Sequence, residues 1–500
     1  MLRNVGSNWA LTLAGIAATY VMTPFIINSL GQEGYGTWTL ITAMTGYMSL
    51  MALGVPMAVV RFLAQDVAEG DSHRMNATVG SCAGLYLIIG GFAIVTGGVL
   101  MALFAAYEIP ATLRGQASIA FAVMVVQVAA GFVGLLPEGI MFAHHDFVVR
   151  NAVRIGAVFV RVALTLGLLK LSGSLVMLAV VQLACLVFDF TLSLVLVRRR
   201  YPEVRVHIGD FEWRTVRRIF SFSLYVLLLG AGARLSFETD ALVIGAILGV
   251  GAIPFYAVAN SLVVYLMDFT IAIAAVVSPM ATKLNTEGKR PQLIEVFLKW
   301  SKISLSLSLM AGLFLIVLGP RFIAWWIAPE FELPAGGVLE ILMISSFLYL
   351  PVRGVALPVL MGLGKPRAPT IAFLAAGVMN LVLSVLLARP MGLAGVALGT
   401  AIPNVLFAAV VLAIACRELE ISVMSYLRYV VPRATLGAIP PLALLMWFRV
   451  GINVQNLAGL VVAGVAMLAL FGLTWILFVY RDDPYVRLPR LSAAFVREPV

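Results

Sequence analysis

Charge is scarce in this sequence. Charged residues make up 12% of the 500 residues, whereas a soluble domain carries roughly 25%. Apolar residues make up 62%, and the mean hydropathy is +1.02. A water-soluble core of this length could not bury so much apolar surface, so a soluble globular fold is excluded.

Cysteine and histidine are also rare. The three cysteines, Cys82, Cys185 and Cys416, fall in or at the end of apolar runs, and their spacing fits neither a disulfide framework nor a zinc site. We expect them to be small buried hydrophobic residues. The His144-His145-Asp146 segment is interpreted as a solvated turn rather than a metal site. No metal site and no cofactor are therefore predicted.

Long apolar runs fill most of the chain. Each helical span needs about 20 apolar residues to cross a hydrocarbon layer of about 30 Å, and continuous apolar runs favour helices over barrel strands. We predict an all-α polytopic membrane protein with about 14 transmembrane helices. The expected spans are 7–29, 36–60, 77–105, 116–137, 152–170, 174–197, 219–247, 252–278, 296–318, 336–362, 369–388, 392–415, 431–449 and 456–480.

Basic residues are unevenly distributed around these spans. Most of the 34 lysines and arginines fall in or beside the termini and the even-numbered loops. The positive-inside bias therefore places both termini in the cytoplasm. The same bias accounts for the net charge of +10, so nucleic acid is not expected as a partner.

The largest hydrophilic segment divides the chain into parts. We predict an N-lobe with spans one to six, a basic cytoplasmic linker, a C-lobe with spans seven to twelve, and a final part with spans thirteen and fourteen and a cytoplasmic tail. Their bounds are 1–200, 201–218, 219–416 and 417–500. The linker is interpreted as a positive-inside anchor rather than a lipid sensor.

A weak internal repeat relates the two lobes. Leu30-Gly31, followed by Tyr35 and Trp38, is echoed by Leu248-Gly249, followed by Phe255 and Tyr256. Two repeats of six spans in the same orientation predict two parallel lobes related by an axis along the membrane normal, with a substrate path between them. Spans thirteen and fourteen have no counterpart and are interpreted as additions to this core.

Two segments resemble a known family. The first is Ser29-Leu-Gly-Gln-Glu-Gly-Tyr-Gly-Thr-Trp38, continuing to Val60-Arg61-Phe-Leu-Ala64, and the second is Thr239-Asp240-Ala-Leu-Val-Ile-Gly-Ala-Ile-Leu-Gly249. They resemble Wzx-type polysaccharide-biosynthesis flippases of the MATE-like multidrug/oligosaccharidyl-lipid/polysaccharide exporter superfamily. One departure is Met51-Ala52, where such proteins often carry an acidic residue, so an ion-coupling role for that residue is not expected here.

This resemblance implies a fold and a function. The fold would be two pseudo-symmetric six-helix bundles forming a V, with two extra C-terminal helices. The protein would lie in the bacterial inner membrane and flip a polyprenyl-pyrophosphate-linked O-antigen, exopolysaccharide or capsule repeat unit to the outer leaflet. Proton or sodium coupling and contact with a polysaccharide polymerase or ligase are left open as partners.

Three arginines, Arg161, Arg234 and Arg353, fall inside spans, where a charge costs at least about 2.5 to 3.5 kcal/mol. Arg150, Arg154 and Arg161 lie within about 40° on a helical wheel and form one stripe. Guanidinium groups bind diphosphate with paired, charge-assisted hydrogen bonds. We therefore predict a cationic cavity for the pyrophosphate, formed by Arg161, Arg353, Arg234, Arg154 and Arg61.

Static roles remain open for each of these arginines. Arg234 and Glu238 are four residues apart and could neutralise each other, and Arg154 could be a cytoplasmic-end anchor. Asp189, Asp268 or freed carbonyl groups could partner Arg161 and Arg353. For ion coupling, Asp240 is carried over from the resemblance, and the lesser candidates are Glu238, Asp268 and Asp189.

Two other functions compete. A multidrug or ion antiporter of the same superfamily would favour twelve spans and an acidic cavity. A membrane glycosyltransferase or polymerase would need acidic catalytic residues on a sizeable external loop, and the first external loop offers only Glu33. We therefore predict a transporter without catalytic residues.

Overall fold

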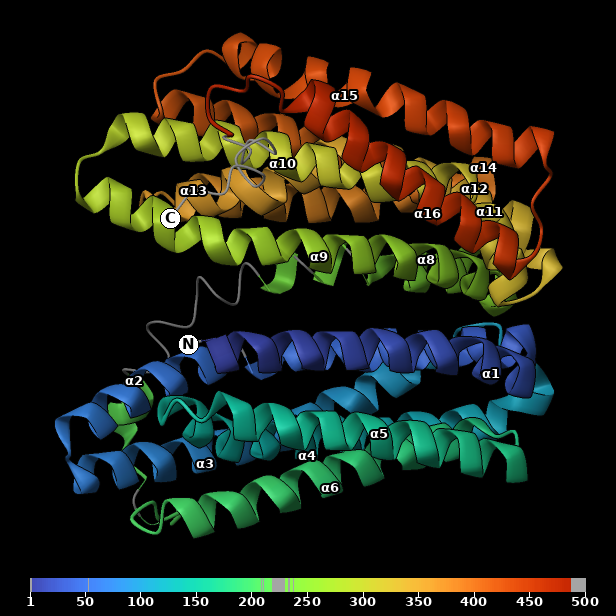
Figure 1. The fold of residues 1–500 in the computed structure, drawn as a ribbon. Coiled ribbons are helices and arrows are strands. Elements are labelled where there is room, and N and C mark those ends of the chain that lie inside the picture. Colours follow the sequence, from blue (N-terminus) through green and yellow to red (C-terminus); the bar gives the residue numbers. More distant parts are fainter. Residues whose placement is uncertain are drawn as a thin grey trace, which may run out of the picture. The chain divides into compact units, whose positions relative to one another are not determined.

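The computed structural model describes residues 2–52, 54–207, 209, 211–217, 230–232, 234–236 and 238–486. These residues form helices joined by short connections, with no strand among them (Figure 1). Eleven helices in this part of the chain are long and apolar enough to cross a membrane. The prediction of an all-α polytopic membrane protein is therefore confirmed.

The chain forms two compact units, residues 1–254 and 255–500. The predicted division into four parts is not tested by this boundary and stays a prediction. The helices of the first unit are α1 (Leu2–Met48), α2 (Val55–Glu69), α3 (Ser72–Phe104), α4 (Ala111–Ala143), α5 (Phe147–Leu171), α6 (Leu175–Arg200) and α8 (Thr239–Ile247). Short 3₁₀ turns η1 (Ser49–Ala52) and η3 (Val250–Ala252) follow α1 and α8.

Helix α1 consists of two arms that meet at Gly31. A straight helix of its 47 residues would be roughly 70 Å long, about twice the thickness of the hydrocarbon layer. Gly31 has φ 71° and ψ 175°, a conformation that glycine adopts without steric cost. The chain therefore reverses there, and Figure 1 shows it returning from the α1 label towards α2.

A second glycine explains how closely the returning arm of α1 packs. A Cβ atom at Gly36 would lie 1.9 Å from the carbonyl oxygen of Val250 in η3. Only glycine therefore allows this approach of two backbones. The contact brings the Gly-Tyr-Gly-Thr-Trp segment of α1 against the end of α8, within the first unit.

The second unit begins within α9 (Ile253–Thr286) and continues through α10 (Arg290–Val317), α11 (Gly319–Trp326), η4 (Pro329–Phe331), α12 (Glu332–Pro351), η5 (Val352–Ala356), α13 (Leu357–Gly362), α14 (Arg367–Glu418), α15 (Val423–Met446), η6 (Trp447–Gly451), α16 (Leu457–Thr474) and η7 (Trp475–Val479). Helix α10 packs against α12 and α15, and α12 packs against α14. Helix α15 therefore packs on the inner helix α10, and α16 packs mainly against α15.

The number of spans stays a prediction. Helix α14 is interrupted at Gly392, which has φ 60° and ψ −138°, so α14 also comprises two arms. Residues 219–229, 233 and 237 of the predicted seventh span, 219–247, lie outside the described residues. Part of the basic linker, including residues 208, 210 and 218, also lies outside them.

Large apolar side chains remain exposed along the helices. On α3, Ile88, Phe92, Val95 and Val99 are each more than half exposed. They recur at intervals of three or four residues and therefore share one face of the helix. Such a face would be unstable in water and fits contact with lipid.

Candidate functional site

A polar pocket lies inside the first unit, between both arms of α1 and helices α5 and α6. Its volume is about 260 Å³, and we call it the Arg161 pocket. It is lined by Thr19, Met22, Thr23, Ile26, Tyr35, Trp38, Thr39, Thr42, Arg161, Thr165, Leu178, Val181 and Gln182. The bend at Gly31 is what brings residues of both arms of α1 to one pocket.

Arg161 lines this pocket, half-buried and with no counter-ion among the described residues. It lies fourteen residues after the start of α5, roughly 21 Å along the helix. Among the described residues its guanidinium forms no hydrogen bond or ion pair, and its Nε is buried without a partner. One turn further, the Oγ1 of Thr165 is also buried and unpaired. Unmade hydrogen bonds of this kind cost about 1 to 3 kcal/mol each, and more for a charged group.

The part of the arginine stripe near the start of α5 has a different environment. Arg150 and Arg154 share one carboxylate, Glu138 on α4, at Nη2–Oε2 distances of 3.2 and 2.8 Å. Arg154 donates a second hydrogen bond to Glu138 Oε1 at 3.0 Å. One carboxylate therefore pairs with two guanidinium groups, and the cluster of these three side chains keeps a net positive charge. Sequence analysis did not identify Glu138.

Helix α6 links this cluster to the Arg161 pocket. Asp189 accepts a hydrogen bond from Ser193 at 3.5 Å and lies within the electrostatic influence of Glu138 and Arg154. Cys185, one turn away, interacts electrostatically with both Arg161 and Asp189. Asp189 forms no ion pair with Arg161. Charged side chains of α4, α5 and α6 within the first unit therefore lead from the Glu138 cluster to the Arg161 pocket, and we call them the charge track. They are Glu138, Arg150, Arg154, Asp189 and Arg161.

Arg234 forms the local ion pair with Glu238 that its spacing allows. Its Nη2 also donates to Ser49 Oγ at 2.9 Å, and the Tyr47 hydroxyl donates to its carbonyl oxygen at 3.2 Å. Asp240 is 2% exposed in the first turn of α8. These residues connect α8 to the second arm of α1, and they leave Arg234 less available to a ligand than Arg161 is.

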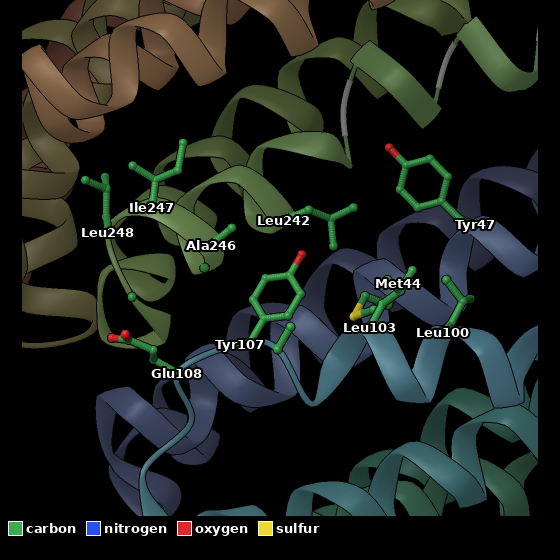
Figure 2. Close-up of a pocket in the computed structure, with 13 residues that line it drawn as sticks. Met44, Tyr47, Leu100, Leu103, Tyr107, Glu108, Leu242, Ala246, Ile247 and Leu248 are labelled. Atoms are coloured by element: carbon green, nitrogen blue, oxygen red, sulfur yellow. The ribbon is translucent and has the colours of Figure 1, made fainter.

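A larger cavity of about 780 Å³ lies beside α8. Its wall is mainly apolar, with leucines of α3 and α8, and Tyr47, Tyr107 and Glu108 supply the polar groups. Figure 2 shows Leu242 between the rings of Tyr47 and Tyr107. No basic residue is among its lining residues, so the Arg161 pocket is the better candidate for binding an anion.

The remaining predicted site residues lie elsewhere. Arg353 belongs to the second unit, in the π-helical turn η5 that follows Pro351, and its guanidinium carbon lies 4.8 Å from the centroid of the Phe373 ring. Among the described residues it forms no ion pair. Asp268 on α9 is exposed and Arg61 on α2 is exposed beside Phe62. A shared cavity for Arg161 and Arg353 stays a prediction.

A fully buried cation, Lys302 on α10, was not identified from the sequence. Its Nζ donates to Asp483 Oδ2 at 2.5 Å and to the Val479 carbonyl oxygen at 2.9 Å, and the two side chains are at most 1% exposed. The Tyr429 hydroxyl donates to Asp483 Oδ1 at 2.7 Å. Lys302 lies inside the predicted span 296–318, which is the signal that could have revealed it.

No group of three or more histidine, cysteine or acidic side chains in the described residues could hold a metal ion. His144 stacks on Tyr201 with ring centroids 3.9 Å apart. Asp146 accepts hydrogen bonds from Arg200 and Tyr201. These contacts therefore connect the His144-His145-Asp146 segment, which follows α4, to the end of α6.

Known proteins resemble this chain over most of its length. Residues 1–285 match the family described as polysaccharide biosynthesis protein. The membrane protein EpsK of Bacillus subtilis, described as uncharacterized, is 23% identical over 81% of this chain and 80% of its own length. A putative O-antigen transporter of Shigella flexneri is 21% identical over 76% of this chain and 90% of its own length.

Two solved structures share the fold. The lipid II flippase MurJ in an inward closed conformation aligns with a TM-score of 0.70 and 11% identity, over 96% of this chain and 99% of that one. An inward-facing MATE family multidrug resistance transporter of the MOP superfamily aligns with a TM-score of 0.67 and 15% identity, over 81% and 94%. Where these names state an activity, it is transport or flipping rather than catalysis.

Proposed function

We propose, from the premise that this chain belongs to the polysaccharide biosynthesis protein family, that it flips a polyprenyl-pyrophosphate-linked oligosaccharide from the inner to the outer leaflet by alternating access. The cargo would be an O-antigen, exopolysaccharide or capsule repeat unit, and the site of action the bacterial inner membrane with both termini cytoplasmic. The names of a putative O-antigen transporter and a lipid II flippase among similar proteins support this cargo class.

The observation that carries the proposal is the unpaired Arg161. A half-buried guanidinium whose buried Nε has no acceptor carries an unmade hydrogen bond, and an anionic ligand would relieve that cost by accepting it. A pyrophosphate supplies oxygen pairs that match the planar fork of arginine. The pocket therefore selects a phosphate-bearing headgroup over a cation.

The charge track suggests how the headgroup reaches the pocket. Arg150 and Arg154 lie one turn apart near the start of α5 and share only Glu138. A pyrophosphate arriving from the cytoplasm would compete with Glu138 for Arg154, whose side chain is 39% exposed. It would then move along the same helix face to Arg161, while the glycan remains in water and the lipid tail in the bilayer. Arg353 would contribute from the second unit.

Ion coupling and partners belong to the same proposal. Glu238, the ion-pair partner of Arg234, lies directly before α8, and Asp240 lies in its first turn. Asp189 and Asp268 are the other candidate proton or sodium acceptors. A polysaccharide polymerase or ligase would receive the flipped product. A basic pocket argues against the alternative of a multidrug antiporter for cationic drugs, because Arg161 repels them.

The test is a double substitution, Arg161→Ala with Arg353→Ala, in cells that depend on this chain for surface glycan. We expect the protein to insert normally while lipid-linked oligosaccharide accumulates on the cytoplasmic leaflet. Arg389→Ala, an exposed arginine of α14, is the control and should leave surface glycan unchanged. Normal surface glycan in the double variant would refute the proposal.

A further inference from the structure

The cavity of about 780 Å³ beside α8 has a different wall from the Arg161 pocket. We call it the α8 cavity, and its lining residues come from the second arm of α1, the end of α3, the α3–α4 connection, α8 and the turn after it, all within the first unit. Its volume equals the share of roughly 26 water molecules at about 30 Å³ each. A buried water needs about two to four polar partners, whereas this wall is mainly apolar. The α8 cavity therefore favours an apolar occupant over water.

One side of the α8 cavity borders the lipid-facing surface of α3. Leu103 lines the cavity and is 56% exposed. It lies four residues after Val99 and therefore continues the exposed face of α3 that starts at Ile88. A bilayer lipid in contact with this face can therefore insert a tail sideways into the cavity.

The polar groups that are available to a ligand lie at one end of the α8 cavity. Tyr107 and Glu108 belong to the α3–α4 connection, shortly after α3 ends at Phe104. Among the described residues, neither side chain forms a hydrogen bond or an ion pair. The positive-inside bias places this connection on the outer side of the membrane, and tyrosine is common at the membrane–water interface. This end of the cavity therefore suits the headgroup of a lipid.

The opposite end of the α8 cavity has its polar group already occupied. Figure 2 shows Tyr47 and Glu108 at opposite ends of the labelled side chains. The Tyr47 hydroxyl is hydrogen-bonded to the Arg234 carbonyl oxygen at 3.2 Å and to Thr239 Oγ1 at 2.5 Å. A lipid therefore finds apolar contacts towards Tyr47 and polar partners at the α3–α4 connection.

Glu108 and Tyr107 determine which headgroup fits. Glu108 is the sole charged residue among the described lining residues. Its carboxylate accepts hydrogen bonds and attracts a cation, and the Tyr107 hydroxyl can donate to a phosphate oxygen. A phosphate that carries a primary ammonium satisfies both side chains. A choline headgroup has the same charge but no N–H donor, and a glycerol headgroup lacks the cation.

We infer that the α8 cavity binds one phospholipid with a primary ammonium headgroup, of the phosphatidylethanolamine class, from the leaflet at the α3–α4 connection. Its tail lies against the leucines of α3 and α8, its phosphate accepts from Tyr107, and its ammonium donates to Glu108. This lipid is separate from the cargo, so the inference does not depend on the proposed function.

Native mass spectrometry of the delipidated chain in detergent tests the choice of headgroup. The probes are phosphatidylethanolamine, phosphatidylcholine and phosphatidylglycerol with identical tails. We expect the first phosphatidylethanolamine to bind about tenfold more tightly than either of the others, because only this headgroup makes the charge-assisted hydrogen bond to Glu108. Equal affinity for phosphatidylethanolamine and phosphatidylcholine would overturn the inference.

Glu108→Gln tests the residue that carries the selectivity. This variant should lose most of the preference for phosphatidylethanolamine and keep its affinity for phosphatidylcholine. Glu33→Gln is the matched control, since Glu33 is an exposed carboxylate at the connection between the two arms of α1 and does not line the cavity. A preference that persists in Glu108→Gln would show that another group recognises the ammonium and would overturn the inference.

A phosphatidylethanolamine with a photoreactive group in its tail locates the bound lipid. We expect labelling of residues 100–108 and 242–249 in the wild-type chain. Ala246→Trp adds a large side chain to the cavity wall and should lower this labelling severalfold, whereas Val95→Trp, on the exposed face of α3 outside the cavity, should not. Labelling confined to the exposed face of α3 would identify a lipid of the surrounding bilayer and overturn the inference, whether or not Ala246→Trp folds.

Competition with the cargo distinguishes this site from the transport path. Farnesyl pyrophosphate, a short polyprenyl pyrophosphate, should leave the labelling of residues 100–108 and 242–249 unchanged when it is present in excess. Displacement of the label would assign the α8 cavity to the cargo's lipid tail and overturn the inference. The proposed function is tested separately by surface glycan in the Arg161 and Arg353 double variant, so the two can fail independently.

Discussion

Arg161 in the first unit is half-buried and Lys302 in the second is fully buried, and the surroundings of these two cations differ. Lys302 contacts Asp483, the Val479 carbonyl oxygen and the faces of Tyr429 and Tyr480. Arg161 has no ion pair among the described residues and keeps an unpaired Nε. A cation whose hydrogen bonds are all made stabilises the fold, whereas a cation in a pocket with an unmade hydrogen bond is available to a ligand.

The positions of Lys302 and Arg161 in the fold agree with these two roles. Lys302 lies on α10, and Asp483 follows η7 at the end of the last span. Their pair therefore fastens the last helix of the second unit to an inner helix. Arg161 lies in a pocket of about 260 Å³. Lys302 therefore has a structural role, and the proposed function assigns a ligand-binding role to Arg161.

The largest expected effect is that of Lys302→Met. Removing one partner of a buried ion pair leaves the other charge uncompensated and typically costs about 3 to 5 kcal/mol. The unfolding temperature of the purified chain in detergent should fall sharply. Adding Asp483→Asn should restore most of the loss, since it removes the orphaned charge. A single variant as stable as the wild-type chain would contradict the structural role of Lys302.

The same substitution at the other cation, Arg161→Met, should have the opposite effect on stability. No carboxylate loses its partner, and a buried unpaired donor disappears, so the free energy of unfolding should stay unchanged or rise by about 1 to 3 kcal/mol. Thermal unfolding under the same conditions measures it. A destabilisation as large as that of Lys302→Met would mean that Arg161 has a structural partner.

Glu138→Gln sharpens the comparison inside the first unit. It frees Arg150 and Arg154 from their shared carboxylate, so we expect the affinity for farnesyl pyrophosphate to rise about threefold to tenfold while stability falls by about 1 kcal/mol. Titration calorimetry in nanodiscs measures the affinity. Glu69→Gln, at an exposed carboxylate of α2, is the control. Weaker binding in Glu138→Gln would show that Glu138 positions the arginines instead of competing with the ligand.

The smallest effect is a dependence of stability on pH. Burial alone would raise the pKa of Asp483, but hydrogen bonds from Lys302 and Tyr429 outweigh it and hold the pKa below the ordinary 3.8. A lowered folded-state pKa contributes stability that is complete above the unfolded-state pKa and is lost as pH falls through the folded-state value. Unfolding temperature should therefore fall below about pH 4, and Asp483→Asn should flatten this decline. An equal decline of the unfolding temperature in Asp483→Asn would show that other carboxylates cause the pH dependence.

Local features were predictable from the sequence. Apolar runs predicted the all-α membrane fold, and the resemblance to polysaccharide-biosynthesis flippases is confirmed by the family match over residues 1–285. The Arg234–Glu238 pair was foreseen as an alternative because four residues of helix bring the two side chains to one face. The position of Arg161 along its helix followed from counting residues, and its depth in the membrane stays a prediction.

Partners distant in sequence were not predictable. Glu138 reaches Arg150 and Arg154 from a neighbouring helix, and Asp483 lies 181 residues from Lys302. The sequence spacing of Glu138 to its two arginines, and of Lys302 to Asp483, does not distinguish these partners from other charged residues of the chain. The Arg161 pocket also depends on packing, since the reversal at Gly31 brings both arms of α1 to α5 and α6.

The most direct test of the account is the initial rate at which the purified chain flips a polyprenyl-pyrophosphate-linked sugar across proteoliposomes, compared between wild type and Arg161→Gln at equal amounts of folded protein. The account predicts a rate at least about tenfold lower in the variant, since one or two charge-assisted hydrogen bonds are lost. An unchanged rate would contradict the claim that this unpaired cation is kept for the headgroup of the cargo.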